Sequence, residues 1–78
     1  MKTLWTGTYH VNDTKSRPCY LIIVAGVIYQ TFVPYDTRRY PLKEFIAEKR
    51  NGRVTGPPLS EEVQELVKLQ LALEELKR

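Results

Sequence analysis

The sequence predicts one α+β domain spanning residues 1–78, with a small three-stranded antiparallel sheet followed by two helices (β-β-β-α-α). Residues 2–33 are rich in Thr, aromatic and β-branched residues, which favour strands. Two later segments carry apolar residues at helical spacing. A chain of 78 residues is long enough for one small core, which argues against a large enclosed active site.

The predicted sheet covers residues 2–33. Residues 2–11 combine Thr and aromatic residues without strong helix formers, and residues 12–18 form a polar loop. The segment 19–33 is dominated by β-branched and aromatic residues. We therefore expect one strand before the loop and two strands after it.

Ala25-Gly26 interrupts the apolar segment once and predicts a hairpin. A two-residue loop there would pair Val24 with Val27, and further along Ile22 with Tyr29 and Tyr20 with Thr31. Glycine in the second position suits a type II turn or a bulged loop, so the register stays open.

A short helix is predicted over residues 41–50, after a loop at residues 34–40. Pro41 suits the first helical position, because its fixed φ and missing N–H are tolerated there. Leu42, Phe45 and Ile46 share one face, and Asn51-Gly52 provides a left-handed stop.

The C-terminal helix is predicted over residues 60–78. Ser60 is its N-cap, and Glu61 and Glu62 complement the positive end of the helix dipole. Its apolar residues form a heptad-like seam, widened by Val63, Val67, Leu71 and Ala72; the seam itself is Leu59, Leu66, Leu69, Leu73 and Leu76. The helix could simply dock on the sheet, but the width of this surface also suits a homodimer or a groove on another protein.

Side-chain alternation leaves neither face of the predicted sheet clearly polar, and Gln30 is the single polar residue on its face of the hairpin. Either each helix covers one face, or a partner covers one of them. Tyr and Trp suit a partner surface because they add contact area with few torsions to freeze. The predicted protein-binding residues are Trp5, Tyr9, Tyr20, Tyr29, Leu66, Leu69, Leu73 and Leu76, the four aromatic ones on condition that the register places them together.

The charge is unevenly distributed along the chain. Residues 1–59 hold nine basic and four acidic residues, and residues 60–78 hold three basic and five acidic ones. The basic surface is either ordinary solubilising charge or an interface for single-stranded nucleic acid. The residues predicted for this alternative are Lys15, Arg17, Arg38, Arg39, Lys49, Arg50 and Arg53.

The sequence contains no recognisable set of catalytic or metal-binding residues. His10, Cys19, Asp13 and Asp36 are the obvious reactive side chains, and they form no known constellation. One cysteine and one histidine make neither a disulfide nor a Cys/His zinc site, so no metal or cofactor is predicted. The ten-residue apolar run is too short to cross a membrane, a step that takes about 20 residues. A cytoplasmic location is expected.

The sequence thus predicts a non-enzymatic binding module of the adaptor, accessory or inhibitor type, a set that includes phage and mobile-element inhibitors. A protein partner and self-association are expected, and nucleic-acid binding is the alternative. No small-molecule substrate and no membrane partner are indicated.

Overall fold

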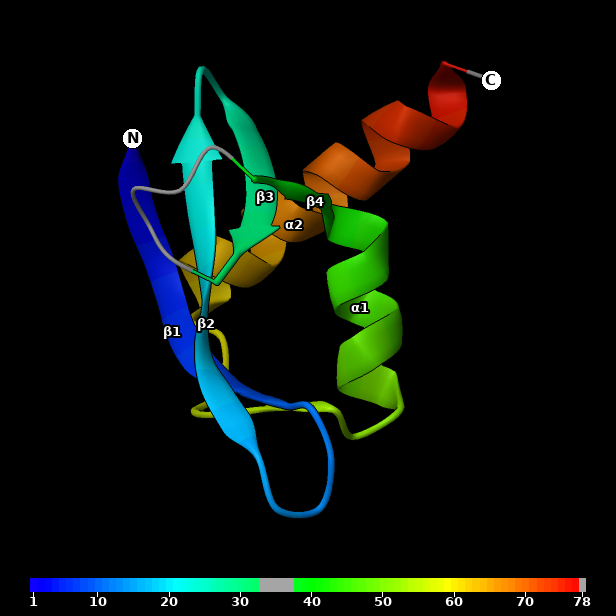
Figure 1. The fold of residues 1–78 in the computed structure, drawn as a ribbon. Helices are drawn as coiled ribbons and strands as arrows, with labels where there is room; N and C mark the ends of the chain where they lie inside the picture. The colour runs from blue at the N-terminus through cyan, green and yellow to red at the C-terminus, as the bar shows by residue number, and fades with distance from the viewer. Residues whose placement is uncertain (33–37, 78) are drawn as a thin grey trace.

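The computed structural model describes residues 1–32 and 38–77. Its strands and helices follow one another along the chain and are labelled in Figure 1. They are β1 (Lys2–His10), β2 (Ser16–Val24), β3 (Val27–Thr31), β4 (Tyr40–Pro41), α1 (Leu42–Arg50), β5 (Val54–Thr55) and α2 (Glu61–Leu76).

The sheet has five antiparallel strands in the order β4-β3-β2-β1-β5, so the predicted three-stranded sheet is wrong. The fold remains α+β, and the sheet curls around its helices (Figure 1). Both missed strands are two residues long, at Tyr40–Pro41 and Val54–Thr55. Side-chain alternation needs several residues to be visible, so strands this short leave no pattern in the sequence.

The first connection is shorter than expected. The polar loop was predicted over residues 12–18, but β2 begins at Ser16, which places Arg17 inside the sheet. Asn12 closes the turn locally, because its side-chain oxygen accepts hydrogen bonds of 2.9 Å from the backbone N–H groups of Thr14 and Lys15. Such Asx turns reverse the chain within a few residues.

The hairpin register confirms the two-residue loop. Val24 pairs with Val27, and the pairing continues through Ile22 with Tyr29 and Tyr20 with Thr31. The expected type II turn is wrong, since Ala25 and Gly26 both have positive φ, at 50° and 80°. Positive φ at both central positions is typical of a type I′ turn, whose twist matches that of the strands.

Ala25→Asn should stabilise the protein. An L-residue in the left-handed region is disfavoured by about 1–2 kcal/mol, and asparagine tolerates this region better than alanine. We expect the free energy of unfolding to rise by about 0.5–1 kcal/mol, measured by urea denaturation. An unchanged or lower midpoint for Ala25→Asn would contradict the assigned turn.

Helix α1 begins one residue later than predicted and ends as predicted. Pro41 is extended, with φ −60° and ψ 147°, and belongs to β4. At the other end Gly52 has φ 80°, and its N–H donates to the carbonyl of Lys49 at 3.2 Å. The N–H of Arg53 donates to the carbonyl of Glu48 at 2.9 Å, which completes a Schellman motif.

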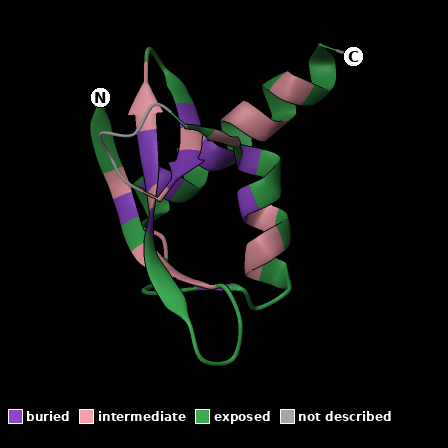
Figure 2. Ribbon diagram, in the orientation of Figure 1, coloured by how far each residue is buried: buried purple, intermediate pink, exposed green. Residues whose placement is uncertain are grey.

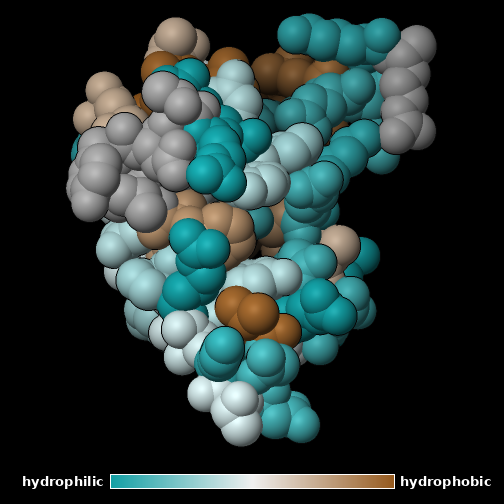
Figure 3. Space-filling view, viewed as in Figure 1, coloured by the Kyte–Doolittle hydropathy of each residue, from teal (hydrophilic) through white to brown (hydrophobic). Residues whose placement is uncertain are grey.

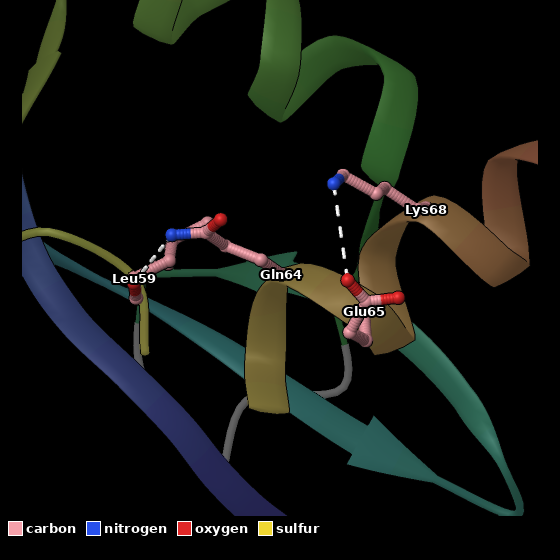
Figure 4. A network of polar contacts seen from close by, with 4 residues as sticks. All are labelled: Leu59, Gln64, Glu65 and Lys68. Carbon is pink, nitrogen blue, oxygen red and sulfur yellow. Dashed lines mark hydrogen bonds and ion pairs between the residues drawn. The ribbon is translucent and has the colours of Figure 1, made fainter. Parts of the chain in front are cut away.

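Ser60 caps α2, as the sequence predicts. Its hydroxyl accepts a 3.2 Å hydrogen bond from the N–H of Val63. In the same turn the Gln64 amide donates to the carbonyl of Leu59 at 2.8 Å, and Lys68 lies 3.8 Å from Glu65 (Figure 4). The hydrogen bonds to Ser60 and Leu59 hold the first turn of α2 to the connector that precedes it, whereas the ion pair lies within the helix.

Both helices pack on the same face of the sheet, so the alternative in which each helix covers its own face does not hold. Buried residues gather where the sheet, α1 and the first half of α2 meet (Figure 2). The core joins sheet and helix side chains in one cluster: Trp5, Cys19, Leu21, Ile28, Leu42, Phe45, Val54, Val63 and Val67.

Trp5 occupies a narrow slot within this core. Its indole N–H donates to the carbonyl of Pro57 at 2.8 Å, and its ring meets the Phe45 ring edge to face at 5.4 Å. A Cβ added to Gly7 or Gly56 would collide with the indole ring. The two glycines therefore leave the space that the tryptophan fills.

The side chain of Gln70 reaches from α2 to the backbone of β3. Its oxygen accepts from the N–H of Ile28 at 2.6 Å, and its amide donates to the carbonyl of Ile28 at 2.9 Å. The neighbouring strand β4 pairs with β3 at Tyr29 and Gln30. Gln70 thus extends the hydrogen bonding of this edge by one residue.

Candidate functional site

The second half of α2 projects beyond the body of the protein (Figure 1). Here the seam predicted from the sequence faces solvent: Leu69 is 59 % exposed, Leu73 49 % and Leu76 81 %. We call these three residues the leucine stripe. The helix is anchored instead through the buried Val63 and Val67 in its first half. Docking on the sheet therefore leaves the stripe uncovered in the monomer.

An apolar groove of about 200 Å³ runs between the leucine stripe and the β2–β3 hairpin. Hydrophobic side chains gather in this region of the surface, between the hairpin turn and the projecting helix (Figure 3). Gln70, Glu74 and Lys77 supply its polar groups. Its apolar lining is Ile23, Val27, Ile28, Leu66, Leu69 and Leu73. Leu66 and two residues of the stripe thus join the hairpin in one continuous apolar surface, which we call the leucine groove.

The four aromatic residues predicted for protein binding do not come together. Trp5 is a core residue, and Tyr9 is partly buried and packs against the core. Tyr20 pairs across the sheet with Thr6, and Tyr29 pairs with Ile22. By alternation both lie on the face opposite Trp5. The structure thus brings together the leucines of the predicted set and separates its aromatic members.

Several predicted nucleic-acid-binding residues lie apart from one another. Lys15 is in the first turn, and Arg50 lines a groove between α1 and α2. Lys49 lies over the Trp5 ring, with its Nζ 6.0 Å from the centroid. Arg39 lies over the Tyr29 ring at 5.7 Å.

Arg53 is held by neighbouring side chains rather than by the other cations. A hydrogen bond with Tyr9 and the nearby Glu48 carboxylate raise the pKa of Arg53, and its Nε lies 3.7 Å from Glu48 Oε2. Two predicted residues do converge: Arg17 and Arg38 line the same polar hollow.

A second concavity lies between the sheet and α1, and we call it the aromatic cleft. Three rings form its wall: Phe32 meets Tyr9 edge to face at 5.1 Å and Tyr40 at 5.4 Å. The buried Gln30 also lines the cleft. Neither Phe32 nor Gln30 was predicted as a site residue. A polar residue within an otherwise apolar strand face was the available signal for Gln30.

Among the described reactive side chains, His10 and Cys19 lie on opposite faces of the sheet. His10 Nε2 lies 2.8 Å from the hydroxyl of Thr55, on the face of the sheet opposite the buried Cys19. Burial raises the pKa of the Cys19 thiol, against the lowering effect of a hydrogen bond with the Gly7 backbone. Asp13 is exposed, and Asp36 lies outside the described residues. Within residues 1–32 and 38–77, no three His, Cys, Asp or Glu side chains are grouped to hold a metal ion.

Neither helix in the described part of the chain is long and apolar enough to span a membrane. No protein-family model matches the chain, and no curated protein or solved structure is significantly similar to it.

Proposed function

We propose that this protein is a small non-catalytic protein-binding module, and that the leucine groove with its stripe is its contact surface. The observation that carries the proposal is the exposure of Leu69, Leu73 and Leu76 on one side of a projecting helix. Contiguous apolar surface of this kind marks interaction sites in water-soluble domains. An adaptor, accessory or inhibitor role in a reducing, cytoplasmic setting is part of the proposal, supported by the buried free thiol of Cys19.

The partner we propose first is a second copy of the chain. Antiparallel packing of two α2 helices, centred on position 71, brings Leu69 level with Leu73 of the other copy. The same arrangement brings Leu66 level with Leu76 of the other copy. Each layer then pairs leucines from two different heptad positions, as in the cores of antiparallel helix pairs. A two-fold axis buries the same patch on both copies.

Apolar burial gives this contact its driving force. Full burial of a leucine side chain contributes about 1.5–3 kcal/mol. The partly exposed leucines of two copies therefore supply several kcal/mol, before the entropy lost on association is subtracted. A weak, concentration-dependent dimer is expected.

Leu69→Glu combined with Leu73→Glu should abolish self-association. The double variant places charge in the stripe, and it should stay folded because both positions are largely exposed. Sedimentation equilibrium over a range of concentrations should show the molar mass of the wild type rising toward that of a dimer. The double variant should remain a monomer with an unchanged far-UV circular dichroism spectrum.

Lys43→Glu is the matched control, since it adds negative charge to an exposed position of α1, outside the leucine groove. It should dimerise like the wild type. A wild type that stays monomeric at about 1 mM would rule out self-association of useful strength. If the double variant unfolds, Leu69→Ser with Leu73→Ser replaces it, and unfolding of that variant as well would show that the stripe belongs to the core.

A further inference from the structure

The aromatic cleft has the size and composition of a small-ligand site. Its volume is about 330 Å³, within the range of about 300–1,000 Å³ that such sites occupy. Tyr9, Phe32 and Tyr40 supply flat apolar walls, and α1 adds the carboxylates of Glu44 and Glu48. The cleft is thus both aromatic and polar, and it shares no lining residue with the leucine groove.

An unpaired hydrogen-bond donor lies in the wall of this cleft. Gln30 is 3 % exposed, and its Nε2 has no hydrogen-bond partner among residues 1–32 and 38–77. Glu48 Oε2 likewise accepts no hydrogen bond from the described residues, although Arg53 Nε lies 3.7 Å away. Burying a polar group without a partner is unfavourable. A ligand with a hydrogen-bond acceptor near Gln30 Nε2 would remove this cost.

The cleft continues into a polar hollow of about 140 Å³. The two share Arg17, Phe32 and Tyr40, and the hollow adds Thr31 and Arg38. The guanidinium of Arg17 lies over the Phe32 ring, 4.2 Å from its centroid. Carboxylates therefore lie on the α1 side of the combined site, and two guanidinium groups lie in the hollow.

Simple ligands do not match this combination. An anion alone would meet Glu44 and Glu48, and a cation alone would meet Arg17 and the Gln30 donor. An apolar ligand would bury the polar groups of the cleft without partners. A flat ring that carries both an acceptor and an amino group, joined to an anion, can pair with Gln30, a carboxylate of α1 and the guanidinium groups of the hollow.

We infer that the aromatic cleft and the polar hollow together bind one nucleotide that has an amino-bearing base. The base stacks against the rings of Phe32 and its neighbours, its ring nitrogen accepts from Gln30, and its exocyclic amine donates to Glu44. The phosphate lies in the hollow beside Arg17 and Arg38. Amide and carboxylate side chains recognise adenine and cytosine edges in this way, and arginine recognises phosphate.

A free nucleotide and one unit of a single strand present the same base and phosphate chemistry, so both are sources of this ligand. Titrations of ¹⁵N-labelled protein with AMP, CMP, UMP and ribose 5-phosphate test the inference directly. AMP and CMP should shift the backbone amides of the cleft strands and bind about tenfold more tightly than UMP or the sugar phosphate. Six-nucleotide oligoadenylate distinguishes the sources: much tighter binding than AMP indicates a single strand, and equal binding per nucleotide indicates the free form.

Gln30→Met tests the unpaired donor with two readouts. Methionine keeps the length of the side chain and removes its polar group, so AMP affinity should fall about tenfold while the thermal midpoint rises. A purely structural role for Gln30 would give a lower thermal midpoint and unchanged AMP affinity, and this result would overturn the inference.

Arg17→Met tests the anion side of the site. It should weaken AMP binding about tenfold and leave adenosine binding unchanged, since adenosine has no phosphate. Arg50→Met is the matched control, because it removes the same charge from a groove outside the site. Equal losses in the two variants, or no amide shifts with AMP and CMP at about 10 mM, would overturn the inference. None of these outcomes depends on the leucine groove, so the proposed function is tested separately.

Discussion

Gly7→Ala should destabilise the protein by about 3 kcal/mol, the upper end of the usual cost of overpacking a core. The new Cβ would overlap the ring of Trp5 and lie 2.6 Å from the carbonyl oxygen of Thr55. Either the indole leaves its slot, which breaks its hydrogen bond to Pro57, or β5 moves away from β1. Both responses disrupt contacts between segments that are far apart in the sequence.

Urea denaturation followed by tryptophan fluorescence measures this effect, because Trp5 is the one tryptophan of the chain. Gly26→Ala is the matched control. Gly26 has positive φ but open space around it, so alanine there should cost about 1 kcal/mol through backbone strain alone. Equal effects of the two substitutions would contradict the close packing of the Trp5 ring against Gly7.

Phe45→Ala should have a larger effect, about 3–5 kcal/mol. The Phe45 side chain is fully buried and contacts the Trp5 ring from α1, so its removal leaves a cavity between the helix and the sheet. Small domains have only about 5–15 kcal/mol of stability in total, and this variant should therefore be largely unfolded at 37 °C.

Thermal unfolding by circular dichroism measures the loss in Phe45→Ala. Val11→Ala is its control, since Val11 is 50 % exposed and its truncation should change the free energy of unfolding by less than about 1 kcal/mol. If Phe45→Ala unfolds cooperatively and with nearly normal stability, the core does not lie around Phe45.

Local signals predicted much of this fold. A long β-branched run broken by Ala25-Gly26 indicates the hairpin, but it leaves the register open. Ser60 predicts the start of α2 and Asn51-Gly52 the end of α1, whereas α2 ends at Leu76 instead of the predicted residue 78. The short strands β4 and β5 could not be predicted, because each forms only when distant segments align. The turn type was missed because Ala25 adopts a backbone conformation that alanine intrinsically disfavours.

The candidate sites could likewise be predicted only in part from local sequence. Heptad spacing located Leu69, Leu73 and Leu76, but their exposure depends on α2 docking through its first half, a tertiary property. Trp5 has the residue type of an interface anchor, but it lies in the core, where its indole N–H donates to the carbonyl of Pro57, 52 residues away. The aromatic cleft assembles rings from three separate strands or their ends, so no local window contains it.

The hydrogen bonds of Gln70 also bear on how this protein avoids aggregation. A strand edge with free N–H and C=O groups is a template on which further strands can add. Because β4 is so short, Gln70 closes the edge at Ile28, and it does so only while α2 is docked. Detachment of α2 would expose that edge together with the apolar run of β2 and β3, the kind of segment that forms cross-β assemblies. One glutamine side chain therefore links the docking of a helix to protection against fibril growth.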